Sequence, residues 1–132
     1  MSANEIAVVE GFYSALARHD MDRVRALIAP EFVLDYPVRS LPWRGQYDGP
    51  DGFFEFFGLR HTRLDTHLTI ERTFQAGNRI VVIAWFEGTV RGTRTIIHGH
   101  EVALLEVHDH RIARFSLFEE TAAILAALEQ TR

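Results

Sequence analysis

The 132-residue sequence contains no cysteine. That absence excludes disulfides, a thiol nucleophile, and zinc or iron–sulfur sites that depend on cysteine ligands. Lysine is absent as well, so all 14 basic residues are arginine, and 18 acidic residues outnumber them. The resulting net charge of −4 provides no basic surface for a nucleic acid, and we expect no nucleic-acid partner.

Long apolar runs are also missing. A helix that crosses a bilayer needs about 20 mostly apolar residues, and no run in the sequence approaches that length. No cationic stretch followed by an apolar one opens the chain. We therefore expect no membrane partner and a cytoplasmic location. The length and the 47% hydrophobic content predict one folded domain over residues 1–132.

The first half of the chain has helical periodicity. Apolar residues recur at intervals of three and four between Ile6 and Leu16, which predicts an amphipathic first helix. Asp20 is a suitable N-cap for a short second helix, which Pro30 ends because its ring cannot continue the hydrogen-bond ladder. A third helix is predicted to begin at Pro50, since proline suits the first position of a helix.

The second half of the chain has the period of two that is typical of strands. We expect strands from residue 65 onward, over residues 79–90, 94–107 and 111–119, and then a closing helix from residue 121. A short strand over residues 32–36 precedes the third helix. The pattern predicts an α+β domain whose helices pack on one face of an antiparallel sheet.

The strand at residues 79–90 is apolar on both of its faces. Such a strand is covered on both sides, yet the predicted helices suffice for one face only. We therefore expect a homodimer in which the outer sheet face is buried against a second copy of the chain.

Several segments resemble the nuclear transport factor 2-like superfamily. Residues 8–22 with 26–32 resemble its opening helices, and residues 111–115 with 118–122 resemble the last strand of its SnoaL-like branch. Residues 40–43 resemble a loop of uncharacterised members. That branch includes polyketide cyclases, ketosteroid isomerases and limonene epoxide hydrolases. The resemblance implies a cone-shaped curved antiparallel sheet, wrapped by three N-terminal helices with a short C-terminal helix, around one apolar pocket.

Comparison with the ketosteroid isomerases implies site positions. Phe12 falls where these enzymes have an oxyanion-hole tyrosine, and Tyr36 falls at their general-base aspartate, so steroid isomerisation itself is not predicted. Glu101 falls at the protonated aspartate of their oxyanion hole and replaces it in kind. The same comparison places three side chains of the last strand in the pocket: Arg114, Ser116 and Phe118.

Glu101 is the main catalytic candidate. It shares a strand face with Ala103 and Leu105, and burial on an apolar face raises a carboxyl pKa toward values useful for acid–base chemistry. Tyr36 or Arg114 would then stabilise a developing oxyanion. The alternative is a structural ion pair between Glu101 and Arg114, in which neither group has a catalytic role.

Other polar candidates are weaker. Asp35 lies in the segment where the family places a base, but alternation with Tyr36 points it outward unless a bulge re-aims it. His98 and His100 share a strand face, but a metal site needs a third ligand, so we expect no metal and no cofactor. The remaining pocket candidates, mostly aromatic, are Phe12, Tyr13, Asp35, Trp43, Phe53, Phe57, Trp85, Ser116 and Phe118.

The function implied is that of a SnoaL-like protein that binds a small hydrophobic or polyketide-like molecule. Glu101 would act as acid or base in an isomerisation, cyclisation or hydration. A first alternative is a non-catalytic ligand-binding or dimerisation module, with Glu101 neutralised by Arg114. A second is an epoxide hydrolase of the limonene type, whose acid–arginine–acid arrangement would need Asp35 near Arg114.

Overall fold

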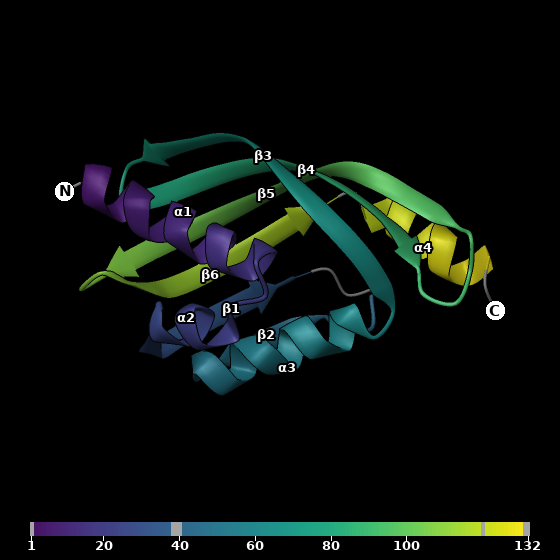
Figure 1. Ribbon diagram of the computed structural model, residues 1–132, viewed down its shortest axis with the longest axis horizontal. Helices are drawn as coiled ribbons and strands as arrows, with labels where there is room; N and C mark the ends of the chain where they lie inside the picture. The colour runs from purple at the N-terminus through teal and green to yellow at the C-terminus, as the bar shows by residue number, and fades with distance from the viewer. Residues whose placement is uncertain (1, 38–40, 120, 131–132) are drawn as a thin grey trace.

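The computed structural model describes residues 2–37, 41–119 and 121–130 (Figure 1). In chain order the elements are α1 (Ser2–Ala17), α2 (Met21–Ala26), β1 (Ile28–Tyr36), β2 (Gly45–Asp48), α3 (Gly49–His61), β3 (Leu64–Ala76), β4 (Arg79–Val90), β5 (Ile96–His108), β6 (Arg111–Glu119) and α4 (Thr121–Gln130). No helix among these residues is long and apolar enough to cross a membrane.

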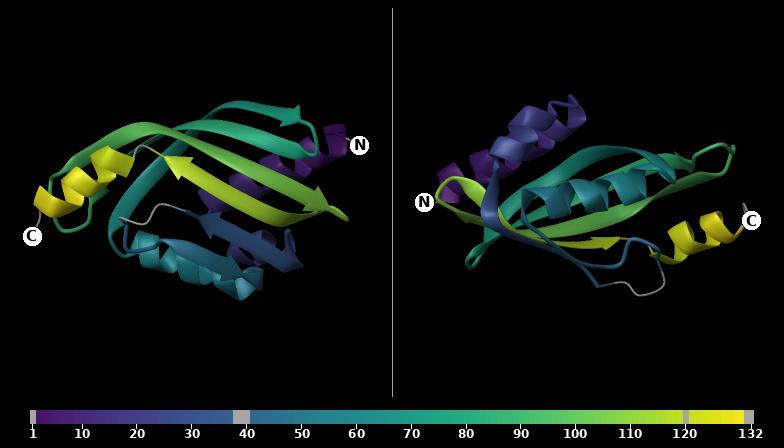
Figure 2. Two further views of the ribbon diagram at one scale, coloured as in Figure 1. Left: turned by 180° about the vertical axis from the view of Figure 1, so that it is seen from behind. Right: turned by 90° about the horizontal axis from the view of Figure 1, so that it is seen from below.

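The six strands form one curved sheet in the order β2-β1-β6-β5-β4-β3. All neighbouring pairs are antiparallel except β1 and β6, which run parallel. Helix α1 packs against β3 to β6, and α3 packs against β1, β2 and β3 (Figures 1 and 2). Helix α4 lies at the far end, against β5. The predicted α+β cone with three N-terminal helices and a short C-terminal helix is therefore confirmed.

Two local predictions differ from the structure. Helix α2 ends at Ala26, and Pro30 lies inside β1, where the pairing with β6 is irregular between Ile28 and Val33. Proline is tolerated at such an irregularity because no ladder hydrogen bond requires its missing N–H. The segment expected to be a loop before α3 contains β2, which pairs with β1. Ser40, in the loop that carries the family resemblance, lies outside the described residues.

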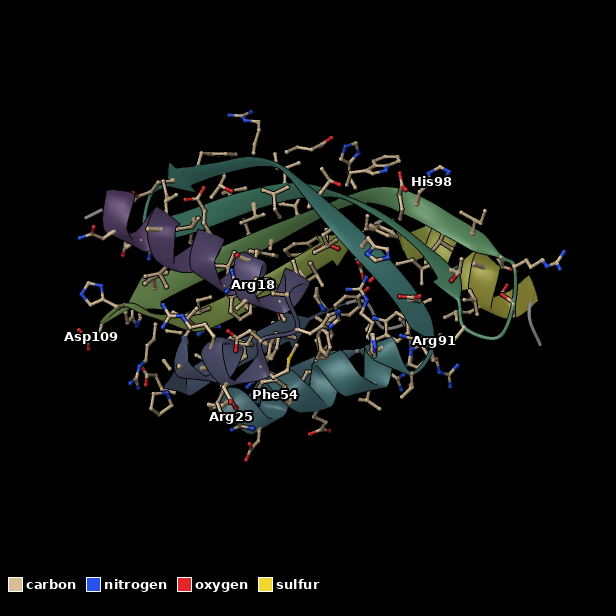
Figure 3. All side chains as sticks on the ribbon, in the orientation of Figure 1. Arg18, Arg25, Phe54, Arg91, His98 and Asp109 are labelled. Carbon is tan, nitrogen blue, oxygen red and sulfur yellow. The ribbon has the colours of Figure 1, made fainter. Side chains whose placement is uncertain are left out.

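The core lies between the concave face of the sheet and the helices. Alternate residues of β4 and β5 point toward the helices, among them Phe86 and Leu105, and both are fully buried. Phe12 of α1 packs edge-on against Phe53 of α3, which holds the two helices together. At the helix surface, Arg25 of α2 lies 4.8 Å from the centre of the Phe54 ring of α3 (Figure 3).

The convex face of the sheet, here called the outer face, has no covering element within the described residues. It includes the half-buried Ile83, Val102 and Leu104, and Phe118 is 44% exposed there. His98 extends from this face, away from the helices (Figure 3). The outer face thus carries apolar side chains that this chain does not itself bury.

Candidate functional site

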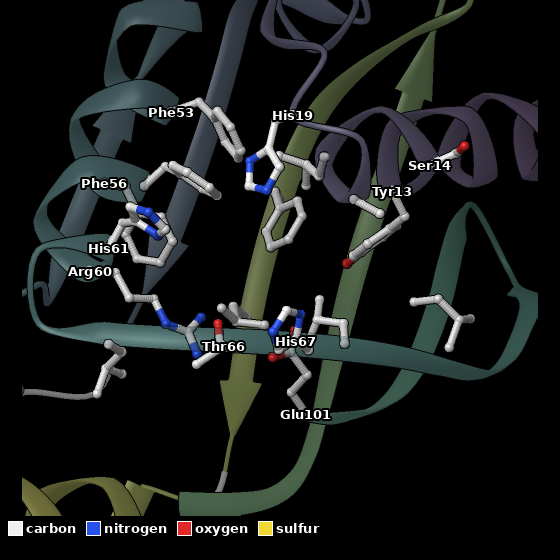
Figure 4. Close-up of a pocket in the computed structure, with 18 of the residues that line it drawn as sticks. Tyr13, Ser14, His19, Phe53, Phe56, Arg60, His61, Thr66, His67 and Glu101 are labelled. Carbon is white, nitrogen blue, oxygen red and sulfur yellow. The ribbon is translucent and has the colours of Figure 1, made fainter. Parts of the chain in front are cut away.

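A cavity of about 520 Å³ lies between α1, α3 and the concave side of the sheet (Figure 4). Tyr13 lines it from α1, and Glu101 lines it from β5. The aromatic and aliphatic side chains in its wall include Phe53, Phe56, Phe57, Phe115 and Leu117. This size falls within the range of about 300–1,000 Å³ that is usual for small-molecule sites.

A cluster of buried polar groups lies at one end of the cavity. The Glu119 side chain is fully buried and accepts hydrogen bonds from Tyr36 Oη at 2.8 Å and Arg60 Nη2 at 2.6 Å. Glu119 is also the cross-strand partner of Glu101. Two side chains from different elements, Tyr36 and Arg60, thus meet on one carboxyl group.

Regular secondary structure explains how these groups meet. On β6, Glu119 shares the inward face with Phe115 and Leu117, each two residues from the next. On α3, Arg60 follows Phe53 and Phe56 at helical spacing, so its side chain leaves the apolar face of the helix. The arginine is 15% exposed and reaches Glu119 across the end of the sheet.

Glu101 has the most perturbed environment among the carboxyl groups. Only 4% of the residue is exposed, and this burial raises the pKa of Glu101 to about 8 against the lowering effect of Arg60. The neighbouring Glu119 carboxylate adds to the rise, both by its charge and by a hydrogen bond to the protonated form. Glu101 is therefore mainly protonated near neutral pH.

Two further polar atoms of the cavity wall are unpaired. The Tyr13 hydroxyl and the Arg60 Nε atom are buried and make no hydrogen bond to any described residue, and the same holds for Glu101 Oε1. Burial, with the Glu101 charge, raises the pKa of Tyr13 well above its ordinary value. The hydroxyl therefore keeps its proton and is a hydrogen-bond donor.

Three histidines line the cavity: His19 in the turn after α1, His61 at the end of α3 and His67 in β3 (Figure 4). The His61 ring stacks on Phe57, with ring centres 5.4 Å apart, and Arg91 donates to both its ring and its carbonyl oxygen. Partial burial and the Arg91 charge lower the pKa of His61. The cavity wall thus combines these polar side chains with the aromatic ones.

Four of the predicted site residues line the cavity: Tyr13, Phe53, Phe57 and Glu101. Phe12 and Trp43 are fully buried behind its wall. The Tyr36 hydroxyl donates to Glu119 and supports that carboxylate, so it is not directed at a ligand. The oxyanion-hole position that the family comparison assigned to Phe12 has no hydroxyl, but the adjacent Tyr13 brings one into the cavity.

Arg114 does not line the cavity, contrary to expectation. It is half-exposed on the outer face, with its Nε 3.7 Å from Glu106 Oε2. The reason is an irregularity in the pairing of β5 with β6, where Val107 pairs with Ile112 but Glu106 pairs with Arg114. After this bulge the odd-numbered residues of β6 point inward. The even-numbered residues Arg114, Ser116 and Phe118 therefore point outward.

Asp35 and Trp85 also lie away from the cavity. Asp35 pairs with Ser116 in the sheet and shares its outward direction, as strand alternation predicted. The Trp85 ring is on the outer face between His98 and His100, with ring centres 5.4 Å and 4.9 Å away. His100 Nε2 lies 2.9 Å from Glu71 Oε1. In the described part of the chain, no group of three potential ligands could hold a metal.

Sequence reasoning missed Arg60 and Glu119. A signal for each was present: Glu119 continues the alternation of Phe115 and Leu117, and Arg60 continues the aromatic stripe of α3. A charged residue at the end of an apolar stripe is usually solvated, so neither pattern alone indicates a buried ion pair.

Comparisons with known proteins agree with this architecture. The sequence model of the SnoaL-like domain family matches residues 9–115. An NTF2-like protein of unknown function from Burkholderia pseudomallei K96243 is 25% identical, with a TM-score of 0.85 over 96% of this chain and 98% of that one. TerC, co-crystallised with polyporic acid, is 21% identical, with a TM-score of 0.84 over 96% and 98%.

A third similar structure is an LEH-like epoxide hydrolase from M. tuberculosis. It is 19% identical, with a TM-score of 0.70 over 98% of this chain and 92% of that one. No curated protein matches the sequence. At these identities the structural likenesses establish a common fold, and the chemistry has to be inferred from the cavity.

Proposed function

Because the chain belongs to the SnoaL-like domain family, we propose that its cavity binds a small, mainly apolar molecule and catalyses a cofactor-independent proton transfer on it. Isomerisation and cyclisation of a carbonyl compound are the reactions that fit best. The observation that carries this proposal is Glu101, a buried carboxyl with a pKa of about 8 in the wall of an apolar cavity. A base is most effective when its pKa lies near the working pH.

The chemistry requires two roles. Ionised Glu101 takes a proton from the carbon next to a carbonyl, and the electron pair of the broken C–H bond moves onto the carbonyl oxygen. Tyr13 stabilises that oxygen by donating its hydroxyl proton in a hydrogen bond. Glu101 then returns the proton to another carbon, which isomerises the ligand. In a cyclisation, the carbanion instead attacks a second carbonyl, the electron pair of that C=O bond moves to its oxygen, and Glu101 gives the proton to this oxygen.

Arg60 and Tyr36 support this cycle without touching the ligand's reacting carbon. They hydrogen-bond to Glu119, whose charge favours the protonated form of Glu101. Arg60 and Tyr36 are in this respect positioning residues.

Deuterium exchange of 1-tetralone, a flat ketone of two fused rings, tests the proposal. In D2O the protein should accelerate exchange of the protons next to the carbonyl, with a rate that rises with pH around a midpoint of about 8, because the ionised base is the active form. Proton nuclear magnetic resonance measures the rate. Binding of 1-tetralone without any acceleration would contradict the proposal and would favour the non-catalytic binding module.

An epoxide hydrolase is the second candidate. Glu101, Arg60 and Glu119 form an acid–arginine–acid cluster, although not with the predicted Asp35 and Arg114. Protonated Glu101 would protonate the epoxide oxygen while Glu119 activates a water molecule. Hydrolysis of limonene oxide to a diol would favour this function over proton transfer at carbon.

We also propose that a second copy of the chain covers the outer face. The apolar side chains of Ile83, Val102 and Leu104, with the exposed Phe118, support this arrangement, since uncovered apolar patches commonly mark an interface. The cavity lies on the concave side of the sheet, so dimerisation through the outer face would not cover it. Light scattering of the purified protein measures the oligomeric state.

A further inference from the structure

A second cavity lies where α1 and α2 meet the turn between β5 and β6. Its volume is about 490 Å³, and it shares no lining residue with the first cavity. The turn, which contains Asp109, is at the end of the sheet opposite α4 (Figures 1 and 3). The proton transfer proposed above uses none of the residues that line this second cavity.

Two arginine side chains in its wall have no partner. Arg23 of α2 and Arg111 of β6 are both exposed, and neither guanidinium forms a hydrogen bond, an ion pair or a ring contact with another described residue. Most of the other described arginines, such as Arg25, do have a partner of this kind. Because each guanidinium offers several N–H donors, two of them at one cavity can bind an anion.

Backbone hydrogen bonds join the segments that carry these two arginines. The Leu27 carbonyl, just after α2, accepts from the N–H of Ile112, the residue that follows Arg111, at 2.7 Å. The Leu27 N–H in turn donates to the Arg23 carbonyl at 3.2 Å. The side chains of Leu27 and Val8 also line the cavity. The cavity therefore presents two guanidinium groups together with an apolar surface.

Several residues around this cavity are not the most stable choice for their local structure. Asp109 and His110 both have left-handed backbone conformations, with φ of 50° and 63°, in a hairpin turn that usually contains glycine or asparagine. Gly11 lies within α1, where alanine would be more stable, and a Cβ there would lie 3.9 Å from Leu27 Cδ1, an ordinary contact. Packing therefore does not require this glycine. Departures of this kind from local preference are typical of functional sites.

The charges in the wall determine which anion fits. Among the described residues that line the cavity, Asp109 is the only acidic one, and it faces two arginine charges. One carboxylate neutralises the excess positive charge, and arginine forms paired hydrogen bonds with a carboxylate. The apolar side chains of the wall favour an acid with a hydrocarbon part over a free inorganic ion.

We propose that this cavity is a second ligand site, which binds the carboxylate of a small organic acid. Arg23 and Arg111 hold the carboxylate oxygens by hydrogen bonds. The hydrocarbon part of the acid lies on Val8 and Leu27, in the space left by Gly11. The inference does not depend on the proton transfer at Glu101, and no covalent bond forms or breaks at this site.

Benzoate and benzamide test the inference, because they have nearly the same shape and only benzoate is charged. Their positions follow from the amide nuclear magnetic resonance signals: Gly11 and Arg111 report on this cavity, and Phe57 and Thr66 report on the first. Benzoate should shift the Gly11 and Arg111 signals and bind there at least about tenfold more tightly than benzamide, as expected for hydrogen bonds between charged groups. No shift of these two signals, or equal affinity of the two compounds, would overturn the inference.

Substitution of one unpaired arginine sharpens the test. Arg111→Gln removes a guanidinium and should weaken benzoate binding at this cavity about tenfold. Arg94→Gln is the matched control, because the Arg94 side chain is also exposed and unpaired among the described residues but lines neither cavity. It should leave the affinity unchanged. Equal benzoate affinities in the two variants would overturn the role of Arg111.

A pair of glycine substitutions tests the space in the cavity. Gly11→Ala should raise the urea midpoint of unfolding, because alanine favours a helix, yet weaken benzoate binding at least about fivefold, because its methyl group occupies part of the site. Gly58→Ala in α3 is the control, since a Cβ there meets nothing within 4 Å and Gly58 lines neither cavity. It should raise the midpoint without changing the affinity. An unchanged benzoate affinity in Gly11→Ala would overturn the placement of the ligand against α1.

Discussion

Carboxyl groups on the two faces of the sheet lie in opposite environments. On the outer face, Glu106 lies 3.7–3.8 Å from basic groups of Arg79, His108 and Arg114, all of which are about half-exposed. On the concave face, Glu101 is buried, and the nearby Arg60 is already paired with Glu119. One strand thus carries a carboxyl group beside three half-exposed basic groups and, five residues away, a carboxyl that holds its proton near neutral pH.

This difference between the two faces shows that the number of ion pairs does not identify a functional site. Three basic groups surround Glu106 on the outer face, but these partners are half-exposed, so water screens their charges. On the concave face, the close pair of Arg60 and Glu119 has a large effect because its surroundings exclude water. Paired substitutions on the two faces can therefore test the account.

Removal of the buried arginine should have the largest effect. Arg60→Met leaves Glu119 buried without its cationic partner and should lower the free energy of unfolding by about 3–5 kcal/mol. Arg114→Met on the outer face should lower it by less than about 1 kcal/mol. Urea unfolding measures both. Equal losses of unfolding free energy in the two variants would show that the buried ion pair contributes no more to stability than the pair on the outer face.

Neutralisation of the two β5 carboxyls should separate catalysis from surface charge. Glu101→Gln should reduce the exchange of 1-tetralone about 100-fold or more, because the base is lost while the shape of the side chain is kept. Glu106→Gln, the matched control, should change the rate less than about twofold. A similar rate for wild type and Glu101→Gln would exclude Glu101 as the base.

The two tyrosines should also differ. Tyr13→Phe should slow exchange about 10-fold by removing the donor to the developing oxyanion, with little loss of stability because its hydroxyl has no protein partner. Tyr36→Phe should instead lower the free energy of unfolding by about 1.5–3 kcal/mol, since Glu119 loses a hydrogen bond. Exchange kinetics and urea unfolding distinguish these results, and a reversed pattern would be inconsistent with the site as described.

A charge introduced on the outer face should disrupt the proposed dimer without changing the cavity. Leu104→Glu should convert the proposed dimer to a monomer in light scattering, because it places a charge among the apolar side chains of that face. The same change at the exposed Leu59 of α3 is the control and should leave the mass unchanged. A wild-type protein that is monomeric at high concentration would contradict the proposed interface.

Local patterns predicted most of the fold. The helices at the start of the chain and the antiparallel strands β3 to β6 follow from the change of period at residue 65, since each depends on neighbouring residues. The parallel pairing of β1 with β6 was not predicted, because it joins segments some 80 residues apart and has no local signature.

The site was predicted only in part for a related reason. Glu101 could be predicted as a buried carboxyl group because its neighbours on the same strand face, before and after it, are apolar. The family comparison placed Arg114 in the pocket, but a bulge at the start of β6 turns it to the outer face, and single-residue bulges are invisible in the sequence pattern. The partnership of Arg60 with Glu119 depends on where α3 crosses the end of the sheet, which only the tertiary structure determines.

The central claim is that Glu101 holds a proton near neutral pH in the wall of the cavity. Carbon-13 nuclear magnetic resonance of the glutamate carboxyls, with Glu101→Gln to assign the signal, measures this directly. The account predicts a pKa of about 8 for Glu101 and a protein that loses stability as the pH rises from about 4.5 to 8, because the unfolded chain ionises first. A Glu101 pKa at or below 4.5 would contradict it.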